Sequence, residues 1–376
     1  MSTINVDIVN PQSTSSVTVN GIIMSSYAGS NFNIGSLQAG MTVGANNNTS
    51  VGSSAGSSIT TGFQNTALGT SALPSCTTGQ NNVAVGASSL QNLNTGNRNI
   101  SIGNFALSSV TGGTNSVAIG YEALKLYTGT PGQVAIGFNA LASTATGINN
   151  TAIGVSALGL ATGSSNTSVG HESLPSLTSG TGNTALGLRA GATFNSGSQN
   201  TIVGYQMGWT LTSGNNNVML GTGQAGASYL SSGSNNILIG YLPEPSTPIV
   251  SNEITLGNSS NTVLRCAVTS ITSLSDARDK KEITELSAGL DFVNALKPVE
   301  FVWDDRNENG KHDVKDFGFI AQDLKKSQED AALAETLNLV YEQNPERLEA
   351  SYGKLVPILV KAIQDLSKEI ETLKSK

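Results

Sequence analysis

A short motif recurs along most of the chain and limits the possible folds more than any other feature. It has the form Asn-x-x-aliphatic-Gly, and its fourteen glycines are 17 residues apart in eleven of the thirteen intervals. A period of this length indicates a stack of similar coils, because one 17-residue unit cannot bury its few aliphatic side chains alone. The glycines are Gly35, Gly52, Gly69, Gly86, Gly103, Gly120, Gly137, Gly154, Gly170, Gly187, Gly204, Gly221, Gly240 and Gly257.

Each copy is predicted to contain one short strand. The residue before the glycine is Ile, Leu or Val in every copy, and a Thr, Val, Ile or Phe stands two places earlier. This alternation predicts a strand with one face buried in the stack. The Ala and Ser residues beside the aliphatic ones predict a tight interior, and the glycines allow close packing that a Cβ would block. The fold class is therefore mainly β, a repetitive β-solenoid or β-roll about 65 Å long at about 4.8 Å per coil.

So thin a coil buries little apolar surface, so we expect several chains to pack together, most simply as a homotrimer. The string Asn-Ser-Val-Ala-Ile-Gly at 115–120 resembles the repeats of trimeric autotransporter adhesin heads, which associate in this way. That resemblance is short and bears on the architecture alone.

Charge is distributed very unevenly. Between Asn31 and Arg265 only eight residues are charged and none is Asp, which is unlike an ordinary α/β domain. The net charge of −7 argues against nucleic acid as a partner, since phosphate binding needs clustered Lys and Arg. The start at Met1 has no signal-peptide pattern, and no apolar run is long enough to span a bilayer, so we expect no membrane partner and synthesis in a host cytoplasm.

The pattern predicts three domains. Residues 1–30 alternate apolar and polar, first at Ile4–Ile8 and again at Val17–Ile22, and should form two short strands paired as a hairpin. This segment serves either as an attachment point or as a cap on the first coil. Residues 31–265 form the solenoid shaft. Residues 266–376 have the composition of a small α+β domain with a coiled-coil helix at its end.

The last helix has apolar residues spaced 3, 4, 3, 4, 3, the a/d pattern of a coiled coil. Val or Ile at a with Leu at d favours two parallel strands, which is a point against a trimer. The other interpretation is a single helix that packs on its own domain. The seam consists of Val356, Leu359, Ile363, Leu366, Ile370 and Leu373.

Four motifs after the shaft resemble the C-terminal intramolecular chaperone of endosialidase-type tail spikes. This self-cleaving peptidase domain ends bacteriophage tail fibres, neck appendages and related viral proteins. The motifs are Ser275-Asp276-x-Arg278-x-Lys280-x-x-Ile283, Leu296-x-Pro298-Val299-x-Phe301-x-Trp303, Gly318-Phe319-Ile320-Ala321-Gln322-Asp323 and Tyr352-x-x-Leu355-Val356-Pro357.

The resemblance implies a domain that trimerises, templates folding of the fibre ahead of it and then cuts itself off. By position, Ser275 matches the nucleophile, Lys280 the base and Gln322 the residue that helps to hold the oxyanion, with cleavage between Ser275 and Asp276. The only enzymatic activity expected is this Ser-Lys self-cleavage, without an external substrate.

The chemistry of such a pair has two requirements. A lysine can take the serine proton only if desolvation or a positive neighbour favours its neutral form, and Arg278 and Lys281 are the candidate neighbours. Attack by Ser275 on its own carbonyl would close a four-membered ring, and attack on the carbonyl of Leu274 a five-membered one. Either a Ser275 from a neighbouring chain attacks, or the mechanism is less simple than the motif suggests.

Other candidate sites are weak. Asp305-x-Asn307-x-Asn309-Gly310 with Asp316 has calcium-loop spacing, but predicted strands rather than helices flank it. Two histidines, His171 and His312, and two cysteines, Cys76 and Cys266, are each isolated. We therefore predict no metal and no cofactor. Exposed aromatic rings could stack on sugars, although packing at a rim is the commoner role; the candidates are Tyr121, Tyr205, Trp209 and Tyr229.

Together these features predict a viral or phage-like tail fibre or appendage, part of a virion, tail or baseplate, that binds a glycan or protein receptor on a host surface. A glycan depolymerase tail spike is the first alternative, although the few scattered acidic residues of the repeat do not form a visible carboxylate pair. A bacterial surface adhesin is the second, and it would need an export signal and an anchor.

Overall fold

The computed structural model describes residues 47–129, 132–144, 146–223, 230–261, 263–265, 275–304 and 313–376, and the backbone of 15–19, 22–26 and 32–35. The chain divides into two compact units, Met1–Gly257 and Asn258–Lys376. The three functional segments predicted from the sequence, with boundaries after residues 30 and 265, stay a prediction.

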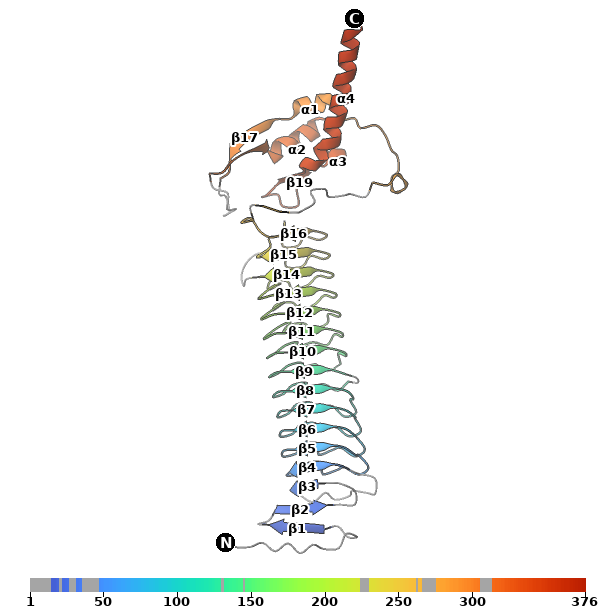
Figure 1. Ribbon diagram of the computed structural model, residues 1–376, viewed down its shortest axis with the longest axis vertical. Helices are drawn as coiled ribbons and strands as arrows, with labels where there is room; N and C mark the ends of the chain where they lie inside the picture. The colour runs from blue at the N-terminus through green and yellow to red at the C-terminus, as the bar shows by residue number, and fades with distance from the viewer. Residues whose placement is uncertain are drawn as a thin grey trace. The chain divides into compact units, whose positions relative to one another are not determined.

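The first unit is a β-solenoid, as the repeat predicts. Its fourteen described parallel strands pair in chain order, one coil to the next (Figure 1). Like residues stack on like: Val117 pairs with Val134, Ala118 with Ala135 and Ile119 with Ile136. The strands are β3 (Phe32–Gly35), β4 (Thr49–Gly52), β5 (Thr66–Leu68), β6 (Val83–Val85), β7 (Ile100–Ile102), β8 (Val117–Ile119), β9 (Val134–Ile136), β10 (Thr151–Ile153), β11 (Thr167–Val169), β12 (Thr184–Leu186), β13 (Thr201–Val203), β14 (Val218–Thr222), β15 (Ile237–Tyr241) and β16 (Ile254–Leu256).

The interior of most coils is filled by a small residue from the strand and by a larger residue that follows the glycine. In β13, β14 and β15 the inward strand residue is larger, namely Ile202, Met219 and Leu238. In one coil, Ala118 of β8, Ala123 and Leu124 are all fully buried. Leu124 has a φ of 51°, so the turn that carries it is left-handed. The Ala-Leu pair after the glycine is therefore the main core element of the repeat.

The aliphatic residues that flank the middle residue of each strand do not fill this interior, which corrects the sequence-based expectation. Aliphatic strand residues lie inside only where they hold the middle position, as Ile202 of β13 and Leu238 of β15 do. The residues on either side of the buried middle one point out of the coil, so Leu68 is 46% exposed and Ile102 is 38% exposed. The physical reason is the narrow coil, in which the Leu after the glycine occupies the space opposite an Ala or Ser of the strand. One chain alone leaves the aliphatic face of its sheet open.

The motif glycines are needed for close approach of successive coils, as predicted. Gly120 has a φ of 137°, and a Cβ there would lie 2.3 Å from the carbonyl oxygen of Gly137. Such a φ strongly favours glycine, and no Cβ fits at that distance. The same relationship recurs at the next copy, where a Cβ on Gly137 would meet the oxygen of Gly154 at 2.4 Å.

The motif asparagines form a buried ladder along the stack. The Oδ1 of Asn82 accepts hydrogen bonds from the backbone N–H and the Nδ2 of Asn99, each at 3.0 Å. The Nδ2 of Asn99 also donates to the carbonyl oxygen of Gly113 at 2.8 Å. Each side chain thus accepts a hydrogen bond from a buried donor in the next coil and donates one to a carbonyl 14 residues further along the chain, which explains why asparagine recurs four places before the glycine.

An antiparallel hairpin precedes the stack. Strands β1 (Ser15–Val19) and β2 (Ile22–Ser26) pair with Val19 opposite Ile22, and β2 continues antiparallel to β3. The expected hairpin exists, but it lies wholly within 15–26, and the first alternating run at Ile4–Ile8 falls outside the described residues. The dipeptide Asn20-Gly21 between these strands is a strong hairpin signal that the sequence reading missed.

The second unit combines two small sheets and several helices around one core. The core contains Ala288, Phe292, Leu337, Leu339, Leu355 and Ile358. Strands β17 and β18 pair antiparallel, as do β19 and β20. The elements are η1 (Ala277–Asp279), α1 (Leu290–Ala295), β17 (Pro298–Val302), β18 (Lys315–Phe319), α2 (Ala321–Asp330), α3 (Ala334–Leu337), β19 (Val340–Tyr341), β20 (Glu349–Ala350), η2 (Tyr352–Lys354) and α4 (Leu355–Lys374).

Helix α4 uses two different faces. Leu355, Ile358 and Ala362 are buried against the rest of the unit. The a/d seam predicted from the sequence lies on another face and is exposed, with Ile363 at 67% and Leu373 at 68%. The helix therefore packs on its own domain and still presents an apolar seam. No helix in the described parts of the chain is long and apolar enough to span a membrane.

Candidate functional site

The side chains of Ser275 and Lys280 meet in the second unit. The Nζ of Lys280 lies 2.6 Å from the Oγ of Ser275 and 3.3 Å from the carbonyl oxygen of the same serine. The short 3-10 helix η1, Ala277–Asp279, lies between them and turns the chain back on itself. The two residues with the spacing of a Ser-Lys dyad are thus within hydrogen-bond distance in a single chain.

Asp276 and Arg278 hold this turn. The Oδ1 of Asp276 accepts a hydrogen bond from the backbone N–H of Arg278 at 2.9 Å and so caps η1. The Arg278 guanidinium grips the same carboxylate with Nε at 3.0 Å from Oδ1 and Nη2 at 2.5 Å from Oδ2. This bond lowers the pKa of the Asp276 carboxyl. The residue after the predicted cut therefore helps to place the lysine.

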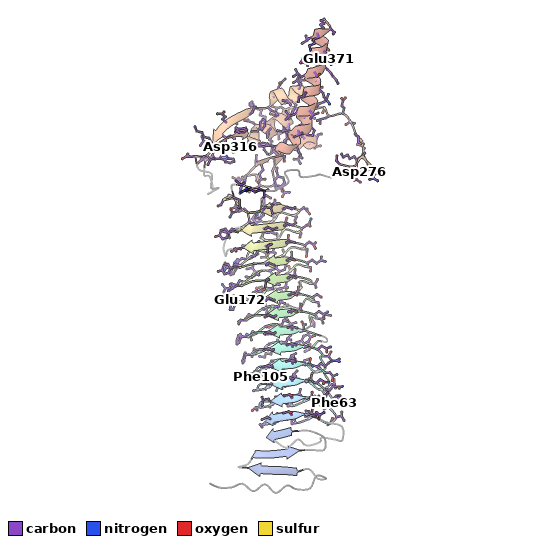
Figure 2. All side chains as sticks on the ribbon, viewed as in Figure 1. Phe63, Phe105, Glu172, Asp276, Asp316 and Glu371 are labelled. Carbon is purple, nitrogen blue, oxygen red and sulfur yellow. The ribbon has the colours of Figure 1, made fainter. Side chains whose placement is uncertain are left out.

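The dyad is exposed in the single chain. Every residue from 275 to 285 is exposed, and Asp276 lies on a loop away from helices α1 to α4 (Figure 2). A lysine serves as a base when its neutral form is favoured by burial or by an uncompensated positive charge. The positive charge of Arg278 is compensated by its ion pair with Asp276. The described residues of one chain thus bring Ser275 and Lys280 within hydrogen-bond distance, but they do not enclose the two side chains.

Gln322 is not part of the dyad in one chain. It is the second residue of α2 and is exposed. Within the described part of the chain it makes no hydrogen bond to Ser275 or Lys280. The predicted nucleophile and base are brought together, and the predicted oxyanion residue is not.

The other three motifs of the domain do come together. Val299 of β17 pairs with Gly318 of β18. The hydroxyl of Tyr352 accepts a hydrogen bond from the backbone N–H of Phe319 at 3.1 Å, and the two rings pack edge to face with centroids 5.9 Å apart. A Cβ on Gly318 would lie 2.5 Å from that hydroxyl, which explains the glycine. These motifs form the scaffold of the unit.

Most of the calcium-type loop, including Asp305, Asn307, Asn309 and Gly310, lies outside the described residues, as does His312. Asp316 is described, and its Oδ2 accepts a hydrogen bond from the Nε1 of Trp303 at 3.1 Å. No group of three or more His, Cys, Asp or Glu side chains suited to a metal occurs among the residues that the structure describes.

Aromatic side chains gather on successive coils of the solenoid. Tyr121 stacks on Phe138 with centroids 5.4 Å apart and meets Phe105 edge to face (Figure 2 labels Phe105). The guanidinium of Arg189 lies over the ring of Trp209, with its Cζ 5.6 Å from the ring centroid. Tyr205 is exposed, and Tyr229 falls outside the described residues. Phe138 was missed from the sequence, although it stands directly after a motif glycine, as Tyr121 and Tyr205 do.

The acidic residues Glu122 and Glu172 of the coils do not form a pair. Glu122 bonds to Lys125 at 2.8 Å, and Glu172 bonds to Arg189 at 2.5 Å. Both glutamates stand two places after a motif glycine, three copies apart, so about 14 Å of stacked strands separates them. A glycosidase needs two carboxylates within about 10 Å, so these two do not suit that role.

Comparison with known proteins supports the C-terminal domain. Residues 275–333 match the family model of the chaperone of endosialidase. The matched segment begins at Ser275 and contains Lys280 and Gln322. No curated protein and no solved structure matches the chain. The chain thus has a β-solenoid of 17-residue repeats, followed along the sequence by a segment similar to the endosialidase chaperone. This order fits a phage tail-fibre or spike type of protein.

Proposed function

We propose that this chain is the precursor of a trimeric fibre of a phage tail or a related viral appendage. The C-terminal unit aligns three chains, templates folding of the solenoid and then cuts itself off between Ser275 and Asp276. The observation that carries the proposal is the 2.6 Å contact between Lys280 Nζ and Ser275 Oγ, at the start of the segment that matches the endosialidase chaperone.

The exposed seam of α4 supports association of the C-terminal units. Its six side chains are 43–68% exposed in the single chain, and burying them against copies of the helix removes apolar surface from water. The a/d residues favour two strands when taken alone, so the trimer depends on the family likeness and on the rest of the unit.

Self-cleavage proceeds as acyl transfer. Lys280 takes the proton of the Ser275 hydroxyl, and the Oγ bonds to the scissile carbonyl carbon. The C–N bond to Asp276 then breaks as the lysine returns the proton to the leaving amine. Water hydrolyses the resulting ester. A Ser275 that attacks the carbonyl of a neighbouring chain avoids the four-membered ring, and a Gln322 brought by that neighbour supplies the oxyanion donor.

The mature shaft acts outside the host cell as part of the virion, where it binds a glycan or protein on a host surface. The exposed aromatic rings of successive coils, such as Tyr121 and Phe138, support a role in contact with sugars. The wide separation of Glu122 and Glu172 gives no support to glycan hydrolysis, and no observation favours the adhesin.

The test is expression of the full chain, followed by a denaturing gel and light scattering under native conditions. We expect a shaft fragment that ends at Ser275, a second fragment that begins at Asp276, and the mass of a trimer. Ser275→Ala should leave the chain whole, and Ser287→Ala, a change at an exposed serine in the same segment, should not. A wild-type chain that stays whole contradicts the cut, and a monomer contradicts the fibre.

A further inference from the structure

The outward face of the solenoid sheet is a continuous apolar stripe. The residue before each motif glycine is aliphatic and is half-buried or exposed in all thirteen described copies, never buried. These residues pair with one another from coil to coil, as Ile102 with Ile119 and Ile119 with Ile136, so they form one unbroken column. The column is Val51, Leu68, Val85, Ile102, Ile119, Ile136, Ile153, Val169, Leu186, Val203, Leu220, Ile239 and Leu256.

A second column runs beside it, two residues earlier in each strand. Its members are Thr, Val or Ile, and none of the described ones is buried. Neither column contains a charged or strongly polar residue. The second column is Thr49, Thr66, Val83, Ile100, Val117, Val134, Thr151, Thr167, Thr184, Thr201, Val218, Ile237 and Ile254.

An open stripe of this length is unusual for a chain that stays single. Parallel sheets normally have both faces covered, and a large contiguous apolar patch marks an interaction surface. Elsewhere on the coils most surface positions hold Ser, Thr, Asn or Gly, and the exposed apolar residues there, such as Leu126 and Leu160, do not recur in every copy. The aliphatic residues therefore indicate a face that is covered in the working molecule.

We propose that this face is covered by the same face of other copies of the chain, packed side by side and in register along the shaft. The inference rests on the proposed fibre of several chains and names the surface that joins them. A partner must match a spacing of about 4.8 Å per coil over the whole stack, and a second copy has that spacing in every coil. Because neither column carries charge, like faces do not repel.

The test places a cysteine on the stripe of the full chain. The background is Cys76→Ala and Cys266→Ser; alanine suits position 76 because Ala161 is buried at the same place in another copy. Ile119→Cys lies on the stripe, and its control Leu126→Cys lies in the segment after the glycine, outside the strand, and is 48% exposed. Ile153→Cys and Leu160→Cys repeat the pair two copies further on.

The purified proteins are treated with a bismaleimide that spans about 10 Å, the separation of facing sheets, and run on a denaturing gel. We expect the two stripe variants to cross-link between chains, with up to about two-thirds of chains joined if three cysteines surround one axis. The two control variants should stay uncross-linked. Circular dichroism shows whether each variant folds. The comparison is made with whichever pair of stripe and control variants is folded.

The outcomes separate this inference from the proposed function. A trimer whose stripe cysteines do not cross-link, or whose control cysteines cross-link instead, overturns the stripe as the interface and leaves the fibre standing. A folded monomer overturns both. Cross-linking at the stripe in a molecule that is never cleaved supports the interface and contradicts only the cut.

Discussion

Lys280 donates a 2.6 Å hydrogen bond from Nζ to the Oγ of Ser275, across the single turn η1. If this lysine is the base of the cut, a side chain that keeps the charge but cannot lose its proton should stop the reaction. We therefore expect Lys280→Arg to leave the full chain whole on a denaturing gel, because the arginine guanidinium stays protonated.

The neighbouring lysine supplies the matched control. Lys281 is also exposed and would contribute only its positive charge, so Lys281→Arg should cut to the same extent as the wild type. If Lys280→Arg still cuts, the lysine is needed for its charge or for the turn, and another group must take the proton.

The motif glycines give a prediction about stability. In Gly120→Ala the new Cβ would lie 2.3 Å from the Gly137 carbonyl oxygen, on a backbone with φ of 137°. Strain and overlap together should lower the free energy of unfolding by at least about 2 kcal/mol per chain. The measurement is the denaturant concentration at the midpoint of unfolding of the solenoid, with circular dichroism as the signal.

Gly112→Ala is the control for that change. Its Cβ would lie 3.5 Å from the Oγ1 of Thr95, an ordinary contact, so we expect a shift within about 0.5 kcal/mol. Equal losses in both variants would mean that successive coils do not approach most closely at the motif glycines.

The strong 17-residue period was enough to predict the solenoid, because backbone pairing between coils follows directly from it. The direction in which each strand faces could not be read from the sequence. The pattern shows that Ile119 and Ala118 alternate, and an aliphatic residue is ordinarily the one inside. The inward position belongs to Ala118 because Leu124, from the following turn, fills the narrow coil.

Only the part of the candidate site that lies within a few residues of Ser275 could be predicted from the sequence. Ser275 and Lys280 are five residues apart, and a short turn with Asp276 as its cap brings them together. Gln322 is 47 residues further along the chain, and whether it reaches the serine depends on packing that no local pattern specifies. Within the described part of the C-terminal unit it makes no hydrogen bond to the dyad, so an arrangement with a neighbouring chain is a proposal.

The buried thiol of Cys76 should be inert. Burial raises its pKa to about 11, and only a weak contact with the Gly79 carbonyl oxygen, at 3.7 Å, opposes this. At pH 8 the thiolate is therefore scarce, and thiolate is the reactive form. In a Cys266→Ser variant we expect no reaction with a thiol reagent at pH 8 until denaturant is added. Rapid labelling of the native protein would contradict the burial of this side chain.

Asp365 should make the C-terminal unit sensitive to acid. Its Oδ1 accepts a 2.7 Å bond from the Nζ of Lys361, its Oδ2 accepts a 3.4 Å bond from the N–H of Leu290, and the lysine lowers its pKa. A lowered carboxyl pKa adds stability above the ordinary carboxyl pKa, and this is lost as the pH falls through the lowered value. Asp365→Asn should therefore lower the melting temperature at pH 7, and the difference from wild type should shrink towards pH 2. Far-ultraviolet circular dichroism at 222 nm measures the melting of this unit, since the described helices lie in it.

Glu371→Gln is the control, because it changes an exposed carboxylate on the same helix (Figure 2). It should melt at the same temperature as the wild type at pH 7. If the deficit of Asp365→Asn is the same at pH 7 and pH 2, the carboxylate charge does not link α4 to α1.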